Sequence, residues 1–324
     1  MNLRSLRERE IIQAIRREFS GKKGDLVLGI GDDAAVIQSA SRRLLLTTDL
    51  LIEDVHFVSS LHPPYLLGRK ALNVNLSDIA AMGGRPKFAL LGLALRRGMA
   101  NDDVTKFFLG FEAAAREHGT ELIGGDISSA AKMAISVTVV GEGKNLVRRS
   151  GAGPGDLIFV SGTLGDAAAG LGLLRKGHKL GRNRRADVLL RAFLDPVPKL
   201  SLGLALSTRR AATAMIDVSD GLSVDLLHLC EESRVGADIQ LARLPLSSEL
   251  RSFVKKPETL ALHGGEDYEL LFTVHPKNLG VIETLQKKYR VRWIGEMKRK
   301  RDIFFTDEKG KKRPLEIKGF EHSA

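Results

Sequence analysis

Hydrophobic residues recur with two different periods along this chain, and the two periods alternate. Apolar positions three and four residues apart predict helices, over residues 5–19, 65–82, 102–118, 165–175, 196–209 and 222–233. Short, nearly continuous apolar runs predict buried strands, over residues 26–30, 43–48, 88–95, 134–142, 157–162, 214–218 and 269–274. Helices and strands interleaved in this way indicate an α/β or α+β fold.

The segment SGAGPGD, residues 150–156, is the clearest boundary in the pattern. Glycine and proline crowd it, and a new apolar strand follows directly. Both periods occur on each side of it, and 324 residues suffice for two hydrophobic cores. We therefore predict two domains, residues 1–149 and residues 150–324.

Composition adds a cellular setting to this picture. Hydrophobic residues make up 43% of the chain and charged residues 27%, which is ordinary for a globular protein. No run approaches 18 uninterrupted apolar residues, and the charged start lacks a signal peptide's apolar core, so we expect no membrane association. The single cysteine, Cys230, cannot form an internal disulfide, and we expect a reducing, cytoplasmic location.

The net charge of +11 suggests nucleic-acid binding, but its distribution argues against that function. Residues 175–191 hold seven basic residues and one acid, and residues 298–313 hold eight basic residues and three acids. These two stretches account for the whole excess, and neither interleaves aromatic residues for base stacking. We expect solvated loops and turns there, and no nucleic-acid partner.

Acidic and polar residues stand at the ends of apolar elements in six motifs. The motifs are GIGDDAA (29–35), LLLTTDLLIEDVHF (44–57), NLSDIAAMGG (75–84), LIGGDIS (122–128), MIDVSDGL (215–222) and LHGGEDYELLF (262–272). Each has a local explanation: Asp after Gly is common in turns, and Ser219 or Asp220 would cap the helix that follows. Taken together, they place six carboxylates beside apolar sequence, those of Asp33, Asp49, Asp78, Asp126, Asp217 and Asp220.

Six carboxylates converging on one cleft would repel one another and take up protons unless cations intervened. Sites rich in oxygen and free of cysteine suit Mg²⁺, which completes its coordination shell with water and phosphate. Thr47 and Thr48 add oxygens beside Asp49, and no His/Cys pattern has the spacing of a zinc site. We therefore predict a magnesium site, provided that these acids meet in space.

The standard nucleotide-binding loops do not account for the acids. A Walker-type GxxxxGK[ST] loop is absent from the sequence. GIGDDA satisfies GxGxxA, with Asp49 near the position of a ribose-binding acid, but residues 38–43 leave no room for a crossover helix. An acid pair in the turn would also repel a pyrophosphate.

Together the motifs resemble the thiamine-monophosphate kinase family, in the superfamily that also contains aminoimidazole ribonucleotide synthetase and selenophosphate synthetase. The resemblance runs from about residue 26 to residue 320. NLSDIAAMGG and GGD are shared across the superfamily, whereas GIGDDAA, TTD with DVHF, the SDGL motif and above all GGEDYELLF are specific to the kinase branch. Two positions depart from the family pattern: Ile317 replaces a frequent Trp, and Ile127 a frequent Thr.

The resemblance implies ATP-dependent phosphorylation of thiamine monophosphate to thiamine diphosphate, with several Mg²⁺ ions and no covalent nucleophile. It implies a two-domain PurM-like fold. The N-terminal domain, a mixed sheet with helices, binds ATP and Mg²⁺ and pairs with a second copy as a dimeric barrel. The C-terminal α/β domain completes the active-site cleft. An alternative is another ATP-dependent enzyme of the superfamily, such as an amide-activating synthetase.

The family motifs also assign residues by position. The implied Mg²⁺ ligands are Asp33, Thr47, Thr48, Asp49, Asp78, Asp126, Asp217 and Asp220. The implied ATP contacts are Gly125, Asp126, Arg149 and Ser219, and the implied thiamine monophosphate contacts are His56, Glu266 and Phe320.

Several of these assignments leave a structural alternative open. We expect Asp33 to face the metal and Asp32 to support the turn. Arg149 suits a bidentate phosphate contact, or is a surface arginine. Glu266 would accept a hydrogen bond from the substrate's aminopyrimidine, whereas Asp267 would cap or pair locally. His56 would hydrogen-bond the substrate or play a structural role, and Gly264 and Gly265 suggest a close backbone approach.

Overall fold

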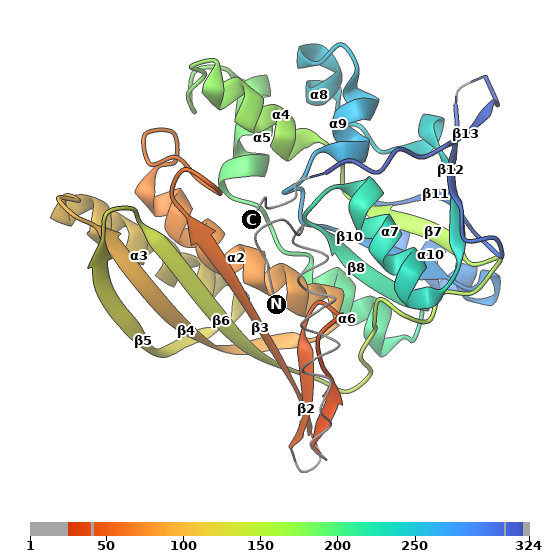
Figure 1. The fold of residues 1–324 in the computed structure, drawn as a ribbon, viewed down its shortest axis with the longest axis horizontal. Helices are drawn as coiled ribbons and strands as arrows, with labels where there is room; N and C mark the ends of the chain where they lie inside the picture. Colours follow the sequence, from red (N-terminus) through yellow and green to blue (C-terminus); the bar gives the residue numbers. More distant parts are fainter. Residues whose placement is uncertain (1–24, 40–41, 308, 320–324) are drawn as a thin grey trace, which may run out of the picture.

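The chain folds into two halves, each built around its own β-sheet (Figure 1). The computed structural model describes residues 25–39, 42–307 and 309–319, so the predicted helix over residues 5–19 lies outside the described residues. The strands of the first sheet come from residues 26–143 and those of the second from residues 157–314. The predicted α/β class is confirmed.

The first sheet has six strands in the order β1-β2-β3-β6-β4-β5. Its strands are β1 (Leu26–Leu28), β2 (Ala35–Ser39), β3 (Arg42–Ile52), β4 (Arg85–Arg96), β5 (Glu121–Ala130) and β6 (Ala134–Gly143). All neighbouring pairs are antiparallel except β4 and β5, which α3 (Asn101–His118) connects as a parallel crossover. Helices α2 (Pro64–Ala81) and α3 cover one face of this sheet (Figure 1).

The second sheet has seven strands in the order β13-β12-β9-β11-β7-β10-β8. Its strands are β7 (Leu157–Ser161), β8 (Ala214–Val218), β9 (Gly236–Gln240), β10 (Glu269–Val274), β11 (Val291–Lys298), β12 (Ile303–Thr306) and β13 (Lys312–Pro314). The helices of this half are α4 (Asp166–Arg175), α5 (Arg184–Leu194), α6 (Leu200–Thr208), α7 (Leu222–Ser233), α8 (Ser248–Phe253), α9 (Pro257–His263) and α10 (Leu279–Gln286). None of the helices within the described ranges is both long and apolar enough to cross a membrane.

Helix α2 lies between the two halves and is buried on nearly all sides. Leu72, Leu76 and Ile79 pack in the core of the first sheet. Ala80 and Ala81 belong instead to the core formed by the second sheet and α6. A helix enclosed in this way has no solvent face for polar residues, so its polar side chains must find partners within the protein.

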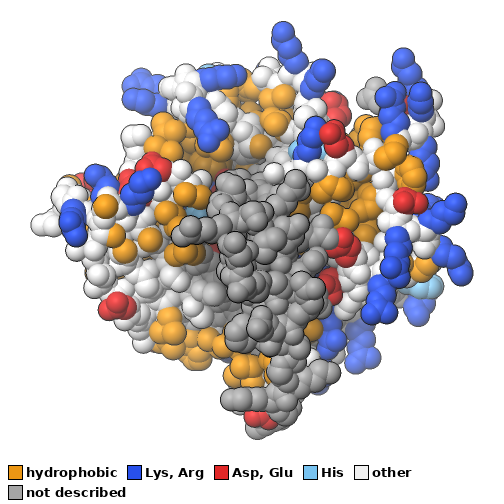
Figure 2. Space-filling view, viewed as in Figure 1, with side chains coloured by type: hydrophobic (Ala, Val, Ile, Leu, Met, Phe, Trp, Pro, Cys, Tyr) orange, Lys and Arg blue, Asp and Glu red, His pale blue; other side chains and the backbone are white. Residues whose placement is uncertain are grey.

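The basic stretch 175–191 differs from the expectation of loops and turns, because α5 occupies residues 184–194. Asn183 caps this helix by accepting hydrogen bonds from the backbone N–H groups of residues 185 and 186. Leu189, Leu190 and Phe193 form its buried face, while its basic residues stay outside. Figure 2 shows the basic side chains of one molecular face scattered along its rim rather than gathered in one patch.

The remaining differences concern element boundaries and short strands. Strand β5 was not expected, since its GGDISS sequence lacks an apolar run. The helix predicted over residues 196–209 begins at Leu200, after an irregular segment that contains Pro196 and Pro198. The stretch 298–313 holds turns together with the short strands β12 and β13.

Candidate active site

Three of the predicted acids meet where the two halves join. Asp33 lies in the turn between β1 and β2, Asp78 on α2, and Asp217 on β8. One carboxylate oxygen of each lies within 4.8 Å of the others. Asp33 and Asp217 are 6% and 3% exposed, so two of the three charges are almost removed from water. The predicted convergence is confirmed for these three acids.

Strand β3 contributes the next two polar groups to the same place. Thr47 is buried and donates its hydroxyl hydrogen bond to Asp78. The backbone N–H of Asp49 donates to Oδ1 of Asn75 on α2 at 3.0 Å, which ties β3 to the helix. Successive strand residues face opposite sides, so Thr48 lies on the exposed face, where it hydrogen-bonds to β6.

The crowding of these acids raises their pKa values. Burial, and then the charge of Asp33, raises the pKa of Asp217 to about 8. Burial raises the pKa of Asp49 to about 6. Burial also raises the pKa of Asp78 well above its usual range, with further contributions from Asp49, Asp217 and Asp33. At neutral pH the cluster therefore needs bound protons or a bound cation.

In the acid pair of the β1–β2 turn, Asp32 supports the turn as expected, whereas Asp33 pairs with Arg149. Asp32 Oδ1 accepts hydrogen bonds from the backbone N–H groups of Asp33, at 3.3 Å, and Arg149, at 3.1 Å. Arg149 itself donates from Nη2 to Asp33 Oδ1 at 2.8 Å, and its side chain is 23% exposed. The alternative of an ordinary surface arginine is therefore wrong. The ion pair engages Oδ1 of Asp33 and leaves Oδ2 without a hydrogen-bond partner among the described residues.

The donor set fits Mg²⁺. Oδ2 of Asp33 is buried and has no hydrogen-bond partner in the part of the chain that the structure describes. Buried oxygens are rarely left without a partner, so this atom marks a position where a further group belongs. Asp33, Asp49, Asp78 and Asp217 offer only hard oxygen ligands, the kind that Mg²⁺ prefers.

Asp220 belongs to a second group, with Asp225 and His228, in which one ligand atom of each lies within 4.8 Å of the others. The expectation that Ser219 or Asp220 caps α7 is wrong, because Gly221 is the N-cap residue and makes no side-chain cap. Asp225 in the first helical turn reaches back instead and accepts from the N–H groups of Asp220 and Gly221, at 3.2 and 3.0 Å.

Gly125 and Asp126 stand apart from the acid cluster of their own chain. Both lie on β5, the exposed edge strand, where a Cβ at Gly125 would come within 2.0 Å of the Leu91 carbonyl oxygen. Asp126 aligns with Leu50 of β3 through β4 and β6. Three strand spacings amount to about 14 Å. The structure therefore does not bring Asp126 to the other acids within one chain.

Of the three predicted thiamine monophosphate contacts, two are described and Phe320 lies outside the described residues. His56 follows β3 in a turn, and its Nδ1 accepts from the Ile52 N–H at 3.0 Å. Glu266 adopts a left-handed φ of 70°, and its N–H donates to the Ser219 carbonyl at 2.7 Å. The expected close approach is confirmed, since a Cβ at Gly265 would lie 2.6 Å from that same oxygen.

Asp267, next to Glu266, has the local role that was expected. Its carboxylate accepts from the N–H groups of Gly165, at 2.6 Å, and Ala167, at 3.1 Å, at the start of α4. These contacts tie the loop after α9 to the beginning of another helix. The loop that carries Glu266 is thereby fixed on both sides.

Sequence reasoning missed the polar residues on α2 that support this region. Ser77 Oγ donates to Asp217 Oδ2 at 2.6 Å, and Lys70 Nζ donates to Glu266 Oε1 at 2.7 Å. A signal was present: Lys70 and Ser77 lie on the predicted helix that carries Asp78, and Lys70 precedes Asp78 by about two helical turns.

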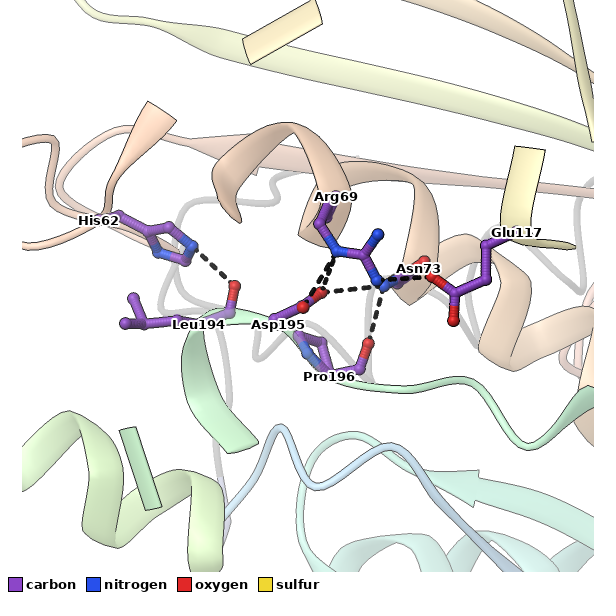
Figure 3. Close-up of polar contacts among 7 residues, drawn as sticks. All are labelled: His62, Arg69, Asn73, Glu117, Leu194, Asp195 and Pro196. Carbon is purple, nitrogen blue, oxygen red and sulfur yellow. Dashed lines mark hydrogen bonds and ion pairs between the residues drawn. The ribbon is translucent and has the colours of Figure 1, made fainter. Parts of the chain in front are cut away.

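A second polar network joins the start of α2 to residues 194–196 of the other half (Figure 3). Arg69 Nε donates to both carboxylate oxygens of Asp195, at 2.9 and 3.0 Å. Asn73 Nδ2 donates to the Pro196 carbonyl at 2.9 Å. Burial, and then the charge of Lys70, lowers the pKa of His62 to about 3, so this ring is neutral and its Nε2 donates to the Leu194 carbonyl at 3.0 Å.

Comparison with known proteins agrees with this architecture. The N-terminal domain model of AIR synthase related proteins matches residues 31–142, and the C-terminal domain model of the same proteins matches residues 153–308. The thiamine-monophosphate kinase of Aquifex aeolicus is 39% identical over 99% of this chain and its own whole length. The enzyme of that name from Escherichia coli K12 is 38% identical over 93% of both chains.

A solved structure gives the same result in three dimensions. It is described as AaThiL complexed with AMPPCP and TMP, and it superposes with a TM-score of 0.89 at 37% identity over 99% of both chains. The two-domain PurM-like fold expected from the sequence is thereby confirmed.

Proposed function

This chain belongs to the thiamine-monophosphate kinase family, and from that membership we propose how its residues carry out the family's reaction. The enzyme uses ATP to phosphorylate thiamine monophosphate, giving thiamine diphosphate and ADP. An oxygen of the acceptor phosphate bonds to the γ-phosphorus, and the bond from that phosphorus to the β-phosphate oxygen breaks. The observation that supports this most directly is the meeting of Asp33, Asp78 and Asp217 between the two halves.

The chemistry explains why acids, rather than a nucleophilic side chain, dominate the site. The acceptor phosphate is itself a nucleophile near neutral pH, so the protein needs no serine, cysteine or histidine nucleophile. The reaction is difficult because its two substrates are both polyanions and repel each other. Two unit charges 4 Å apart interact by roughly 4 kcal/mol at an effective dielectric near 20. Positioning and charge neutralisation should therefore carry catalysis.

We assign the metal site to Asp33, Asp49, Asp78 and Asp217, with the hydroxyl of Thr47 orienting Asp78. When bound, Mg²⁺ supplies the positive charge that offsets these carboxylates and the phosphates of both substrates. Ser77 supports the set by holding Oδ2 of Asp217, which fixes the orientation of that carboxylate. The roles of Thr47, Thr48, Asp126 and Asp220 as ligands stay predictions.

Binding of ATP is assigned to Gly125, Asp126, Arg149 and Ser219. Arg149 is suited to this role because only Nη2 is engaged by Asp33, while its buried Nε has no partner among the described residues. A guanidinium with an unused donor is well placed to take a phosphate oxygen. Ser219 stands between Asp217, the acid of β8, and Asp220, and its backbone carbonyl holds the Glu266 loop.

Binding of thiamine monophosphate is assigned to His56, Glu266 and Phe320. Glu266 supports the assignment because its backbone is held at Ser219 while its side chain is 26% exposed. His56 is positioned by a turn anchored on buried Glu53, whose carboxylate accepts from Ser59 Oγ and from the Met133 N–H, at 2.5 and 2.9 Å. Phe320 follows the last described residue, and its role stays a prediction.

We propose that the chain acts as a homodimer through its first sheet. Among the described residues, helices cover one face of that sheet, whereas the opposite face exposes Leu50, Phe88 and Leu90 at 51%, 41% and 41%. Exposed apolar groups gathered on one face are typical of a protein interface. Because Asp126 stands three strands from Asp49, its role at ATP would be exerted across this interface.

Two further expectations accompany this function. The division into residues 1–149 and 150–324 agrees with the two separate sheets and stays a proposal. A cytoplasmic location rests on the single cysteine, Cys230, a buried thiol.

Product formation tests the proposed function directly. Purified protein incubated with ATP, Mg²⁺ and thiamine monophosphate should release ADP and thiamine diphosphate in equal amounts, measured by chromatography. Aminoimidazole precursors offered in place of thiamine monophosphate should release no ADP. A folded sample that makes no thiamine diphosphate would refute the assignment.

A further inference from the structure

Lys70 is an almost completely buried lysine whose charge has one carboxylate partner. Its side chain is 1% exposed, in the middle of α2. Nζ donates to Glu266 Oε1 at 2.7 Å and to the Phe193 carbonyl at 3.0 Å, and it lies 3.9 Å from the centre of the Phe193 ring. Every side of the ammonium group is therefore occupied by protein.

Such burial is costly for a charged group. Moving an ammonium out of water costs several kcal/mol, which is offset only when a counter-charge and hydrogen bonds surround it. A leucine or methionine would fill the same volume on α2 without that cost. A lysine at this position therefore implies a task that an apolar residue cannot perform.

The task is visible at Glu266, where the two carboxylate oxygens differ. Oε1 is held by Lys70, whereas no residue of the described ranges donates to Oε2. The backbone at this residue is also constrained, with a left-handed φ of 70° and an N–H bonded to the Ser219 carbonyl. Residues other than glycine adopt this left-handed conformation at a cost of about 1–2 kcal/mol. At Glu266 the surrounding contacts hold the backbone in that conformation.

We propose that Lys70 is a positioning residue for thiamine monophosphate, which fixes one oxygen of Glu266 so that the other accepts a hydrogen bond from the substrate. This inference rests on the proposed function, where Glu266 is assigned to the substrate. It adds a residue that the family motifs do not assign. Lys70 acts through Glu266 and does not itself contact the reacting phosphates.

The same lysine also ties α2 to the end of α5, and this structural role must be separated from positioning. Asn73 lies three residues further along the helix and makes the matched contact, donating to Pro196 and Asp195 without touching Glu266. Asn73→Ala therefore removes a comparable tie between the halves and leaves Glu266 as it is. It is the control for the experiment.

The experiment compares Lys70→Met, Glu266→Gln, the double variant and Asn73→Ala with the unaltered chain. For each protein, steady-state kinetics with Mg²⁺ give KM for thiamine monophosphate and for ATP separately, and circular dichroism reports the folded fraction. Loss of a charge-assisted contact should raise KM for thiamine monophosphate about tenfold in Lys70→Met, with KM for ATP within about twofold. The double variant should have a KM for thiamine monophosphate no higher than that of the single variant with the higher KM. Lys70 and Glu266 act through the same contact with the substrate, so their effects should not add.

The outcomes separate the proposal from its premises. If Lys70→Met lowers only the folded fraction, as Asn73→Ala should, and leaves both KM values unchanged, the positioning role is wrong. If Glu266→Gln leaves KM for thiamine monophosphate unchanged, the proposal fails together with the substrate role of Glu266. An unaltered chain without activity would instead refute the proposed function. Should Lys70→Met not fold, Lys70→Gln keeps a donor of similar length and is judged by the same two KM values.

Discussion

Replacing Asp217 with asparagine should stabilise the metal-free protein at pH 8 and abolish its activity. The substitution removes one negative charge from the cluster of Asp33, Asp49 and Asp78. It preserves the shape of the side chain and an acceptor oxygen for Ser77. A site built to hold cations is strained in their absence, so loss of function and gain of stability should occur together.

The size of the effect follows from the pKa of Asp217, which burial and Asp33 raise from 3.8 to about 8. Between these values the folded chain keeps a proton that the unfolded chain has released. The free energy of unfolding therefore falls as pH rises through this window, by 1.36 kcal/mol for each pH unit. The loss between pH 4 and pH 8 is on the order of 5 kcal/mol, which is the upper limit of what Asp217→Asn can recover.

Urea unfolding in a chelating buffer, at pH 5 and at pH 8, measures how much free energy of unfolding the Asp217→Asn substitution restores. We expect Asp217→Asn to raise the free energy of unfolding by at least about 1 kcal/mol at pH 8, and by less at pH 5. Glu283→Gln, on the exposed side of α10, controls for loss of one negative charge elsewhere. Adding Mg²⁺ should stabilise the unaltered chain more than the variant.

Two results would refute this reasoning. The first is that Asp217→Asn unfolds at lower urea concentration than the unaltered chain at pH 8 without metal. The second is a stability difference that does not change between pH 5 and pH 8. Either would mean that the charge of Asp217 is compensated within the protein, so that no cation is needed.

The remaining predictions concern catalysis, assembly and local stability. Asp49→Asn should keep the fold and lose most of kcat, because the cluster loses a ligand; a near-normal rate in a steady-state assay would remove Asp49 from the metal set. Leu90→Glu, which places a charge on the exposed sheet face, should convert a homodimer of 35.4 kDa chains into monomers in light scattering, and an unchanged mass would contradict the proposed interface. Asn183→Ala should lower the free energy of unfolding by about 1 kcal/mol through loss of the α5 cap, with kcat unaltered; urea unfolding without a shift would show that the cap is dispensable.

Much of the fold was predictable because strong periodicity marks long elements. Helix α2 was expected over residues 65–82 and occupies residues 64–81, and β8 and β10 were predicted with their observed bounds. In these segments local pattern and tertiary burial agree, so the sequence alone is informative. The same holds for the turn at Asp32, whose glycine and acid pair indicate a turn before any contact is known.

Other elements were not predictable from local pattern. Strand β5 has no apolar run because it is an exposed edge strand. The sequence pattern of α5 was hard to recognise because arginines are interspersed with the apolar residues of its buried face. Asp225 was missed because an acid within a first helical turn has many uses, and only the fold shows that its carboxylate reaches back to the Asp220 N–H.

The sequence by itself determined the candidate residues and the family: acids beside apolar strands, glycines where backbones approach closely, and motifs shared with the thiamine-monophosphate kinases. Only the tertiary structure decided which of them meet. Asp33, Asp78 and Asp217 come together because α2 is enclosed between the two sheets, whereas Asp126 stays on an edge strand of its own chain. Contacts between distant segments depend on sheet order and on which face each residue occupies, and short-range periodicity carries neither. For the same reason the pairing of Lys70 with Glu266, nearly two hundred residues away, emerged only from the packing of α2 against the other half.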